Sequence, residues 1–468
     1  MTTTADHEPS FVIDVVYESH RAAAARPPKE RTAAWLQLIQ RQRSRAAAEE
    51  AEFILRLAEL CPDEEDPPPD HPGAAKTYWM SARSEFPGVS EFFVDELAAV
   101  LGVGRGTAAH KATRAFTWRD SLPATFAALK GGELEERRAQ IFADTLEHTA
   151  SRLAWRVEQV VLPEASRLGF DALKKRILAV LLELDPEEAD ERRELAAKAS
   201  DVWVEPGADG RATFSAEMDA EEAAEGKEFI STLAVMAKQD GDPRPIGQIR
   251  CEIHSLLIRG AALDAAGVRT SLTITAALES LEGTSAQPGE VSGHAITPAQ
   301  LADLLRRVGA LGVHTPDGGQ LTFAITDADG RIIATLDLEQ LQRRVMRGQG
   351  ADPPPPTESY TPTRSQRALV NTRDRGCRYP FCPERAGWAD HDHVVPHAEG
   401  GPTTCTNLCC LCRHHHRLKT LAKGWLFRME PDGTLHVTTP SGITRTTQPW
   451  AMRRRPPSPP PDPDPPPF

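Results

Sequence analysis

The sequence predicts an α+β protein with a mostly helical N-terminal domain, a few β-hairpins, a small C-terminal module and a disordered proline-rich tail. Three observations lead to this prediction. The 468 residues suffice for about three domains of ~150 residues each. Apolar residues recur at helical spacing through much of the first two thirds of the chain. Six of the eight cysteines cluster near the C-terminus, between positions 377 and 412.

Composition divides the chain into five segments. They are a disordered segment at 1–28, a mainly helical domain at 29–347, a linker at 348–360, the module at 361–448 and a disordered tail at 449–468. The linker is rich in glycine and proline, which favours an extended connection. The tail holds ten prolines and is expected to be extended or disordered.

The helical domain begins with residues 31–60, where Ala, Leu, Glu and Arg predominate and apolar positions follow a helical period. The acidic, proline-rich stretch 61–73 cannot continue that helix. Residues 90–184 then predict successive helices, with breaks at Gly104-Arg105-Gly106 and at Gly131-Gly132.

One part of this region, residues 90–115, resembles a helix-turn-helix, with an apolar helix, a glycine turn and a second helix. The second helix offers Arg105, His110, Lys111 and Arg114 for phosphate contact. A plain helical hairpin is the alternative, and it is the interpretation we favour.

Several β-hairpins are expected among the helices. Residues 202–216 alternate around a glycine turn, and residues 321–338 carry Asp-Gly at their turn. Two helices are predicted near 218–238 and 245–264, and a strand within 271–281. A final hairpin is predicted within residues 429–446.

Charge is distributed unevenly along the chain. The net charge is −13, and the first 360 residues hold 39 basic against 58 acidic side chains. Residues 361–428 instead hold 11 basic against 5 acidic side chains. A nucleic acid is therefore a plausible partner for the C-terminal module only.

Hydropathy bears on location. There is no run of 18 or more apolar residues, so no membrane span is expected. The N-terminal segment lacks the apolar core of a signal peptide. We therefore expect a cytoplasmic protein.

The cysteine cluster predicts a metal site. Cys377 and Cys382 form one knuckle, and Cys412 and His415 form a second about thirty residues later. Two such knuckles can close a tetrahedral zinc site, and the metal would supply folding energy that so small a core lacks. Three further cysteines are rival ligands, of which the last two are interpreted as small core residues: Cys405, Cys409 and Cys410.

Between the knuckles lies DHDHVVPHAEGG, which resembles the start of the HNH nuclease motif. The ordered pattern continues through Asp392-His393, Gly400-Gly401, Asn407-Leu408, Leu411-Cys412 and His416-x-x-Lys419. The resemblance implies a ββα-metal fold, with a two-stranded hairpin from about Trp388 to Thr404 and then a helix carrying His416.

The resemblance also implies roles in phosphodiester hydrolysis. His393 would be the general base, and Asp392 and His416 would hold Mg²⁺ or another divalent ion. Asn407 would orient the base or complete the metal shell. Asp392 stands where many HNH proteins have histidine, although nuclease domains of CRISPR effectors also have aspartate there.

Basic residues enter the module from a predicted helix, and contact with the backbone of DNA, expected to be double-stranded, is one interpretation. A solvated charged face is the other. The candidates are Arg364, Arg367, Arg373, Arg375, Arg378 and Lys419.

Further stretches within residues 30–427 resemble the actinobacterial 13E12-repeat family, including SLPATFAALKGGELEERRAQIFAD and TPTRSQRALVNTRDRGCRYPFC. That family joins a largely helical domain of unknown function to a C-terminal HNH module. The resemblance implies a metal-dependent DNA endonuclease. Two alternatives remain open: a zinc-stapled DNA-binding protein without cleavage, and a mobile-element accessory protein whose N-terminal domain binds protein.

Overall fold

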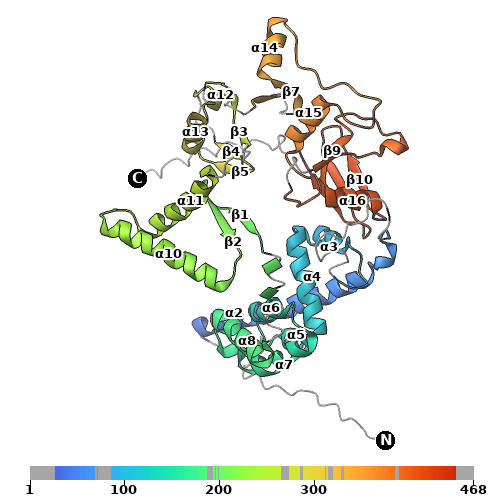
Figure 1. Cartoon of the computed structure of the whole chain (residues 1–468). Coiled ribbons are helices and arrows are strands. Elements are labelled where there is room, and N and C mark those ends of the chain that lie inside the picture. Colours follow the sequence, from blue (N-terminus) through green and yellow to red (C-terminus); the bar gives the residue numbers. More distant parts are fainter. Residues whose placement is uncertain are drawn as a thin grey trace, which may run out of the picture. The chain divides into compact units, whose positions relative to one another are not determined.

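The computed structural model divides into two compact units, one within residues 1–186 and 322–468 and the other within residues 187–321 (Figure 1). The residues that it describes are 27–68, 71, 86–186, 193–194, 197–198, 200–264, 273–284, 288–310, 312–314, 320–327, 331–384 and 389–449. The disorder predicted for residues 1–28 lies outside the described residues except at Pro27 and Pro28, and Pro28 already begins a helix. The disorder predicted for the tail lies outside them beyond Pro449.

The N-terminal part of the first unit is a bundle of helices. Its elements are α2 (Pro28–Glu59), the 3₁₀ helix η1 (Asp63–Glu65), α3 (Phe93–Leu101), α4 (Arg105–Asp120), α5 (Pro123–Gly131), α6 (Glu136–Leu146), α7 (Ser151–Val161), η2 (Leu162–Arg167) and α8 (Phe170–Leu184). Buried Ala48, Ala51, Leu55 and Ala58 lie at helical spacing on α2. That apolar stripe faces a core that includes Phe142.

Of the two breaks predicted within this bundle, the one at Gly131-Gly132 is confirmed. The one predicted at Gly104-Arg105-Gly106 lies slightly earlier, since Arg105 and Gly106 already belong to α4. Helix α3 ends at Leu101 and is followed by Gly102, whose φ of 70° is a left-handed conformation that glycine adopts without strain. Helix α5 begins at Pro123 and ends at Gly131, and Gly132 follows it in the same left-handed conformation. The helix predicted at 31–60 is α2.

Helices α3 and α4 correspond to the possible helix-turn-helix. On α4, Lys111 is paired with Glu50, and Arg114 lies 2.6 Å from Asp144. Cations already paired within the bundle are less available to phosphate groups, which favours a plain helical hairpin.

The second unit contains the predicted hairpin and helix pair. Its elements are β1 (Val202–Pro206), β2 (Ala212–Ala216), α10 (Ala220–Gln239), α11 (Ile246–Asp264), β3 (Ile274–Thr275), α12 (Leu278–Leu281), β4 (Gly289–Val291), β5 (His294–Ile296) and α13 (Pro298–Arg307). The strand expected within 271–281 ends earlier than predicted. Among the described residues 273–281, Ile274 and Thr275 pair with β4, and the chain then turns into α12.

The first unit ends in a mixed region. Its elements are β6 (Thr322–Thr326), β7 (Ile332–Asp337), α14 (Leu338–Met346), α15 (Arg364–Asp374), β8 (Ala389–His393), the 3₁₀ helix η4 (His397–Glu399), β9 (Leu408–Cys412), α16 (Arg413–Leu421), β10 (Leu426–Met429), β11 (Leu435–Thr438) and β12 (Thr444–Thr447). Strands β6 and β7 form the hairpin predicted at 321–338, whose Asp-Gly turn lies outside the described residues.

One hairpin prediction is wrong, and another is confirmed with an additional strand. Strand β8 pairs with β9, so the second strand lies at Leu408–Cys412, beyond the expected end at Thr404. The reason is a long loop of fourteen residues, 394–407, that is held by its own hydrogen bonds. At the C-terminus, the hairpin predicted within residues 429–446 is confirmed as β11 and β12, and β10 pairs with β11 to give a three-stranded antiparallel sheet.

A small core holds this C-terminal module together. Leu411, Leu418, Leu435 and Val437 are buried in it, so the final sheet packs with β9 and α16. Phe92, just before α3, belongs to the same core. Among the described residues, no helix is both long and apolar enough to cross a membrane.

Candidate metal centre and catalytic site

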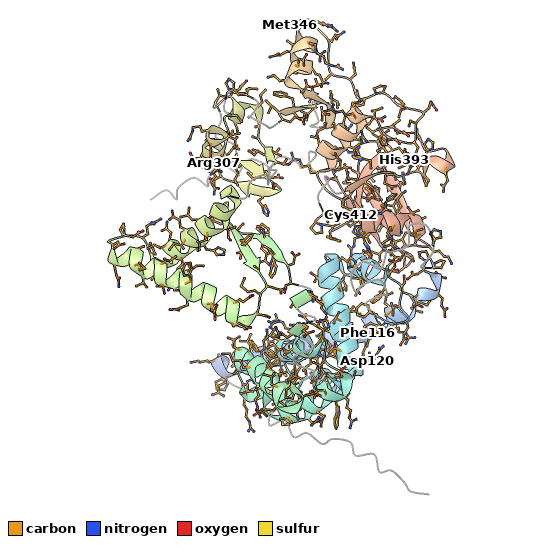
Figure 2. The ribbon with its side chains drawn as sticks, in the orientation of Figure 1. Phe116, Asp120, Arg307, Met346, His393 and Cys412 are labelled. Carbon is orange, nitrogen blue, oxygen red and sulfur yellow. The ribbon has the colours of Figure 1, made fainter. Side chains whose placement is uncertain are left out.

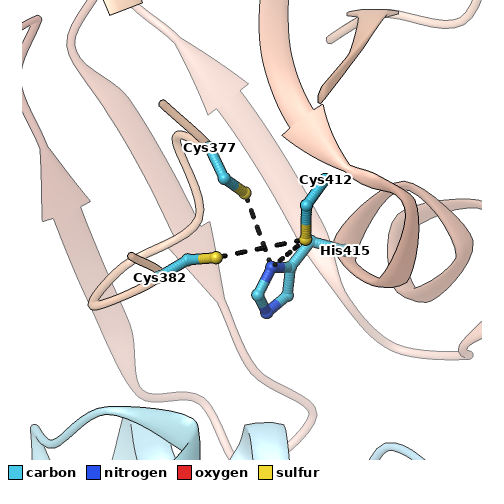
Figure 3. A group of neighbouring side chains, drawn as sticks. All are labelled: Cys377, Cys382, Cys412 and His415. Atoms are coloured by element: carbon cyan, nitrogen blue, oxygen red, sulfur yellow. Dashed lines mark hydrogen bonds between the residues drawn. The ribbon is translucent and has the colours of Figure 1, made fainter. Parts of the chain in front are cut away.

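The four residues predicted to hold zinc come together at one point. The Cys377 and Cys412 sulfurs lie 3.5 Å and 3.1 Å from His415 Nδ1, and Cys382 Sγ lies 4.0 Å from Cys412 Sγ (Figure 3). Zinc–sulfur bonds of ~2.3 Å at tetrahedral angles place two sulfurs about 3.8 Å apart. The spacing therefore fits a single tetrahedral ion, and this group could bind a metal such as zinc.

The local fold explains this convergence. Cys412 ends β9 and is the residue just before α16, so His415 lies one turn along that helix. Cys377 and Cys382 lie on the loop after α15. The Tyr379 ring stacks on the His415 imidazole, with centroids 3.8 Å apart and planes 7° from parallel. This stacking fixes the plane of the histidine that completes the cluster.

The thiols of the cluster share their protons unequally. Hydrogen bonds from Cys377 and Cys382 hold the pKa of Cys412 far below its usual value. The corresponding hydrogen bonds raise the pKa of Cys377. One thiolate is therefore favoured among the three, and thiolate is the form that binds a metal ion.

The rival cysteines lie apart from the cluster. Cys409 and Cys410 are fully buried, as the sequence predicts for core residues. Burial raises the pKa of both thiols, which keeps them protonated. Cys405 packs beside Cys410 in a small second core with Val370. Their packing accounts for these cysteines without a ligand role.

A second cluster surrounds His416, the residue after the zinc-type ligand. Its Nδ1 lies 2.9 Å from Asp390 Oδ2, and its Nε2 lies 3.3 Å from Asp392 Oδ1. Asp390 and Asp392 alternate with His391 along β8, so both carboxylates face α16. An N–H donated from Nδ1 to Asp390 leaves the Nε2 lone pair directed toward Asp392.

This second cluster offers two ligand atoms that a divalent ion could share, Asp392 Oδ1 and His416 Nε2. The separation of Asp392 Oδ1 and His416 Nε2 is close to the ~3 Å expected between two ligands of one ion. Lys419 Nζ lies 2.9 Å from Asp392 Oδ2 and supplies positive charge there.

His393 points away from that cluster, since it occupies the other face of β8. Its Nε2 lies 2.8 Å from Thr403 Oγ1, and the Tyr360 ring stacks over it at 5.3 Å. His397 contacts both rings. Burial lowers the pKa of His393, so its imidazole is neutral near neutral pH. His393 is labelled in Figure 2.

Tyr360 also revises the predicted linker at 348–360. Within it, Thr357 pairs with Thr403, and Pro355 accepts a hydrogen bond from Gln366. The end of the linker is therefore part of the module, because its backbone and its aromatic ring pack on the loop that carries Thr403.

Asn407 has a different role from the two considered in the sequence. Its amide nitrogen donates to the Val395 and Pro402 carbonyls, and its Oδ1 accepts from Val395 N–H. These bonds clamp the loop between β8 and β9. Among the described contacts, Asn407 acts on that loop and not on the His393 ring or on Asp392.

Two of the predicted phosphate-binding arginines are internal. Arg373 is 8% exposed and donates to Asp374 and to the Cys405 and Leu408 carbonyls. Arg378 is also buried and donates to Asp374. Their guanidinium groups join α15 to β9 and the final sheet. Phosphate contact is not supported for either residue, because their donors are turned inward.

The remaining basic candidates differ in access. Lys419 is directed inward, to Asp392 and the His393 carbonyl, so phosphate contact is not supported for it in this arrangement. Arg375 is half-buried at the end of α15. Arg364 and Arg367 are exposed on the first two turns of α15. They are the candidates that a nucleic acid could reach.

Sequence reasoning missed one buried acid, Asp95 of α3. It accepts hydrogen bonds from His414 and His415, at 2.8 Å and 3.2 Å, across more than 300 residues of sequence. His414 is therefore held against α3 by this contact. The available signal was the pair Asp95-Glu96 inside an otherwise apolar helix, since buried carboxylates require partners.

The fold and the cluster together define a protein that joins a helical domain to a cysteine- and histidine-rich module able to bind a metal. Residues 33–321 match the model of the domain of unknown function DUF222, and the chain belongs to that family. This domain is the N-terminal domain of the 13E12-repeat proteins, which confirms that part of the predicted resemblance.

Two mycobacterial relatives illustrate the extent of similarity. The uncharacterized protein Rv3776 of Mycobacterium tuberculosis is 30% identical over 399 residues, 76% of this chain and 70% of that protein. The uncharacterized protein Rv2100 of the same organism is 44% identical over 90 residues, 19% of this chain and 16% of that protein. No solved structure matches the chain.

Proposed function

We propose that the C-terminal module is a metal-dependent HNH endonuclease that hydrolyses DNA phosphodiester bonds and is stapled by zinc. The observation that carries the proposal is the approach of Asp392 Oδ1 to His416 Nε2, at 3.3 Å, in a strand–strand–helix unit. Zinc would bind at Cys377, Cys382, Cys412 and His415, where the sulfur-rich ligand set suits that ion.

Each residue has a defined part in the proposed reaction. A Mg²⁺ or Mn²⁺ ion held by Asp392 and His416 would supply positive charge to the phosphate and the leaving oxygen. His393 takes a proton from the attacking water as the new phosphorus–oxygen bond forms. The bond from phosphorus to the leaving sugar oxygen then breaks, and that oxygen takes a proton from solvent.

Several features support His393 as the base. Its lowered pKa leaves a neutral imidazole that can accept a proton near neutral pH. Donation from Nε2–H to Thr403 would leave the Nδ1 lone pair as the proton acceptor. Because Tyr360 stacks on the ring, this proposal requires Tyr360 to shift when DNA enters.

The test is a nicking assay with the full chain, supercoiled plasmid and Mg²⁺ or Mn²⁺. His393→Ala should lower the nicking rate roughly 10²–10⁴-fold, the usual contribution of a general base. Binding of DNA should persist. His397→Ala is a matched control, since it removes a neighbouring ring in the same aromatic cluster.

Two outcomes would count against the proposal. Equal nicking by His393→Ala would remove the assignment of the base. DNA binding without nicking by the unaltered protein would favour the alternative of a zinc-stapled DNA-binding protein.

A further inference from the structure

Helix α3 of the N-terminal domain brings a buried carboxylate to the metal cluster. Asp95 is 0% exposed and lies in the first turn of α3. Its Oδ1 is 3.2 Å from His415 Nε2, and its Oδ2 is 2.8 Å from His414 Nε2. A fully buried carboxylate is costly without partners, and two imidazoles from α16 are the nearest ones.

The two nitrogens of His415 face different groups. Nδ1 faces the sulfurs of Cys377 and Cys412, and Nε2 faces Asp95. A neutral imidazole has one N–H, and placing it at Nε2 lets His415 donate to Asp95 while Nδ1 keeps its lone pair for a metal. Carboxylates behind metal-bound histidines set this tautomer and make the ligand more basic.

Other contacts attach α3 to the module without touching a cluster ligand's ring nitrogens. Arg417 is paired with Glu91 at 2.7 Å. Arg445 donates to the Ala99 and Val100 carbonyls at the end of α3, at 2.7 Å and 3.0 Å. Helix α3 is therefore held at both ends, and Asp95 lies between these attachments.

Asp95 also has a cation of its own domain nearby. Arg105 Nε lies 3.6 Å from Asp95 Oδ2, on the oxygen that His414 contacts. The oxygen facing His415 has no such cation among the described ion pairs. The two oxygens of Asp95 therefore have different partners: Oδ1 contacts His415 of the metal cluster, and Oδ2 is paired with Arg105 of the helical domain.

We propose that Asp95 is the positioning residue of the metal centre, so that metal binding in the module and docking of helix α3 are one coupled equilibrium. The inference rests on the zinc site of the proposed function, and it does not depend on nuclease activity. Coupling is reciprocal: a docked α3 tightens metal binding, and a bound metal tightens the docking of α3.

The first experiment measures zinc affinity of the full chain by competition with a chromogenic chelator. Asp95→Asn keeps the shape of the side chain but removes its charge, and it should weaken zinc binding roughly 10–100-fold. Glu91→Gln is the matched control. It removes a partly exposed ion pair that is not bonded to a cluster ligand. Because such a pair contributes little to stability, α3 should stay docked and zinc affinity should remain within about twofold of wild type.

The second experiment uses the unaltered protein, so it remains decisive if Asp95→Asn fails to fold. Amide hydrogen exchange across residues 93–101 is compared before and after zinc is removed. Removal should speed exchange in α3, while exchange in α8, which belongs to the same bundle, should change little.

The outcomes separate the inference from the proposed function. Wild-type zinc affinity in Asp95→Asn, or unchanged exchange in α3 after zinc removal, overturns the role of Asp95 alone. A wild-type chain that binds no zinc overturns both the zinc site and the inference. If the wild-type chain does not nick DNA but the effects of Asp95→Asn on zinc affinity and of zinc on exchange in α3 are as expected, the result counts against the nuclease only.

Discussion

Adjacent histidines on α16 belong to two different clusters. His415 faces three sulfurs and is nearly inaccessible, with 4% of its side chain exposed, whereas 26% of the His416 side chain is exposed. The first cluster is enclosed and sulfur-rich, and the second is open and built of carboxylates and imidazole. Consecutive helical residues point about 100° apart, so one short helix can serve a structural site and a reactive site.

The two clusters also differ in how many candidate ligands already converge on one point. Four side chains of the sulfur cluster already converge. In the other, Asp390 holds His416 and Lys419 is paired with Asp392, so charge is balanced before any ion arrives. An enclosed site suits folding, while a site with exposed ligand edges suits a substrate.

The strongest test of this comparison replaces each of the two histidines in turn and measures both the nicking rate and the zinc content. His416→Asn should lower the nicking rate by more than the roughly 10–100-fold that loss of a residue behind a metal ligand costs. Zinc content, measured by elemental analysis, should stay at the wild-type level. His415→Asn should instead lower the zinc content and the thermal stability of the protein.

If both variants lost zinc equally, the two clusters would not be independent. If His416→Asn nicked DNA at the wild-type rate, the second cluster would not hold the catalytic ion.

Asp374 joins α15 to β9, because it accepts hydrogen bonds from Arg373, Arg378 and the Cys410 N–H, and replacing it should destabilise the module. Burial alone would raise the pKa of Asp374, but Arg373, joined by Arg378, leaves it below its ordinary value of 3.8. A lowered pKa gives stability that is present above pH 3.8 and is lost as pH falls. Asp374→Asn should cost about 3–5 kcal/mol near neutral pH, because it leaves two buried guanidinium groups unpaired.

Urea unfolding followed from neutral to acidic pH checks this prediction. The gap in stability between wild type and Asp374→Asn should narrow as pH falls below the ordinary value. A constant gap would show that the carboxylate's charge is not what stabilises the module.

The two basic surfaces of the first unit should differ in DNA binding. Arg364→Gln with Arg367→Gln removes two exposed cations of α15. If each contacts one phosphate, the slope of log affinity against log salt should fall by about 0.9 per contact. Lys111→Gln with Arg114→Gln removes paired cations of α4 and serves as the control, with little change in slope.

Filter binding at several salt concentrations measures both slopes. If the slope fell more in the α4 variant than in the α15 variant, the result would support the helix-turn-helix interpretation, which the ion pairs of Lys111 and Arg114 disfavour.

The smallest expected effect concerns the order in which thiols react. Hydrogen bonds lower the pKa of Cys412, whereas burial raises that of Cys409 and Cys410. After zinc is removed, alkylation followed by mass spectrometry should modify Cys412 before Cys409 or Cys410. Modification of Cys409 first would question which thiols form the cluster.

Much of the fold was predictable because its signals are local. The helix at 31–60, the glycine breaks after α3 and α5, and the hairpins at 202–216 and 321–338 depend on nearby residues. The second strand of the β8–β9 hairpin was misplaced, since the loop before it is shaped by contacts of Asn407 and Gly401 that spacing does not reveal. A side chain at Gly401 would meet the Val395 carbonyl oxygen at 1.9 Å.

The sequence by itself determined which side chains form the sulfur cluster, because each of the two pairs of ligands is only a few residues apart in the chain and consists of cysteine and histidine. It also supplied Asp392, His393 and His416 as candidates. Only the tertiary structure decided that Arg373 is internal and that Tyr360 covers His393. The same is true of Asp95, which meets a histidine 320 residues away. Those placements depend on packing between distant segments, for which no local pattern exists.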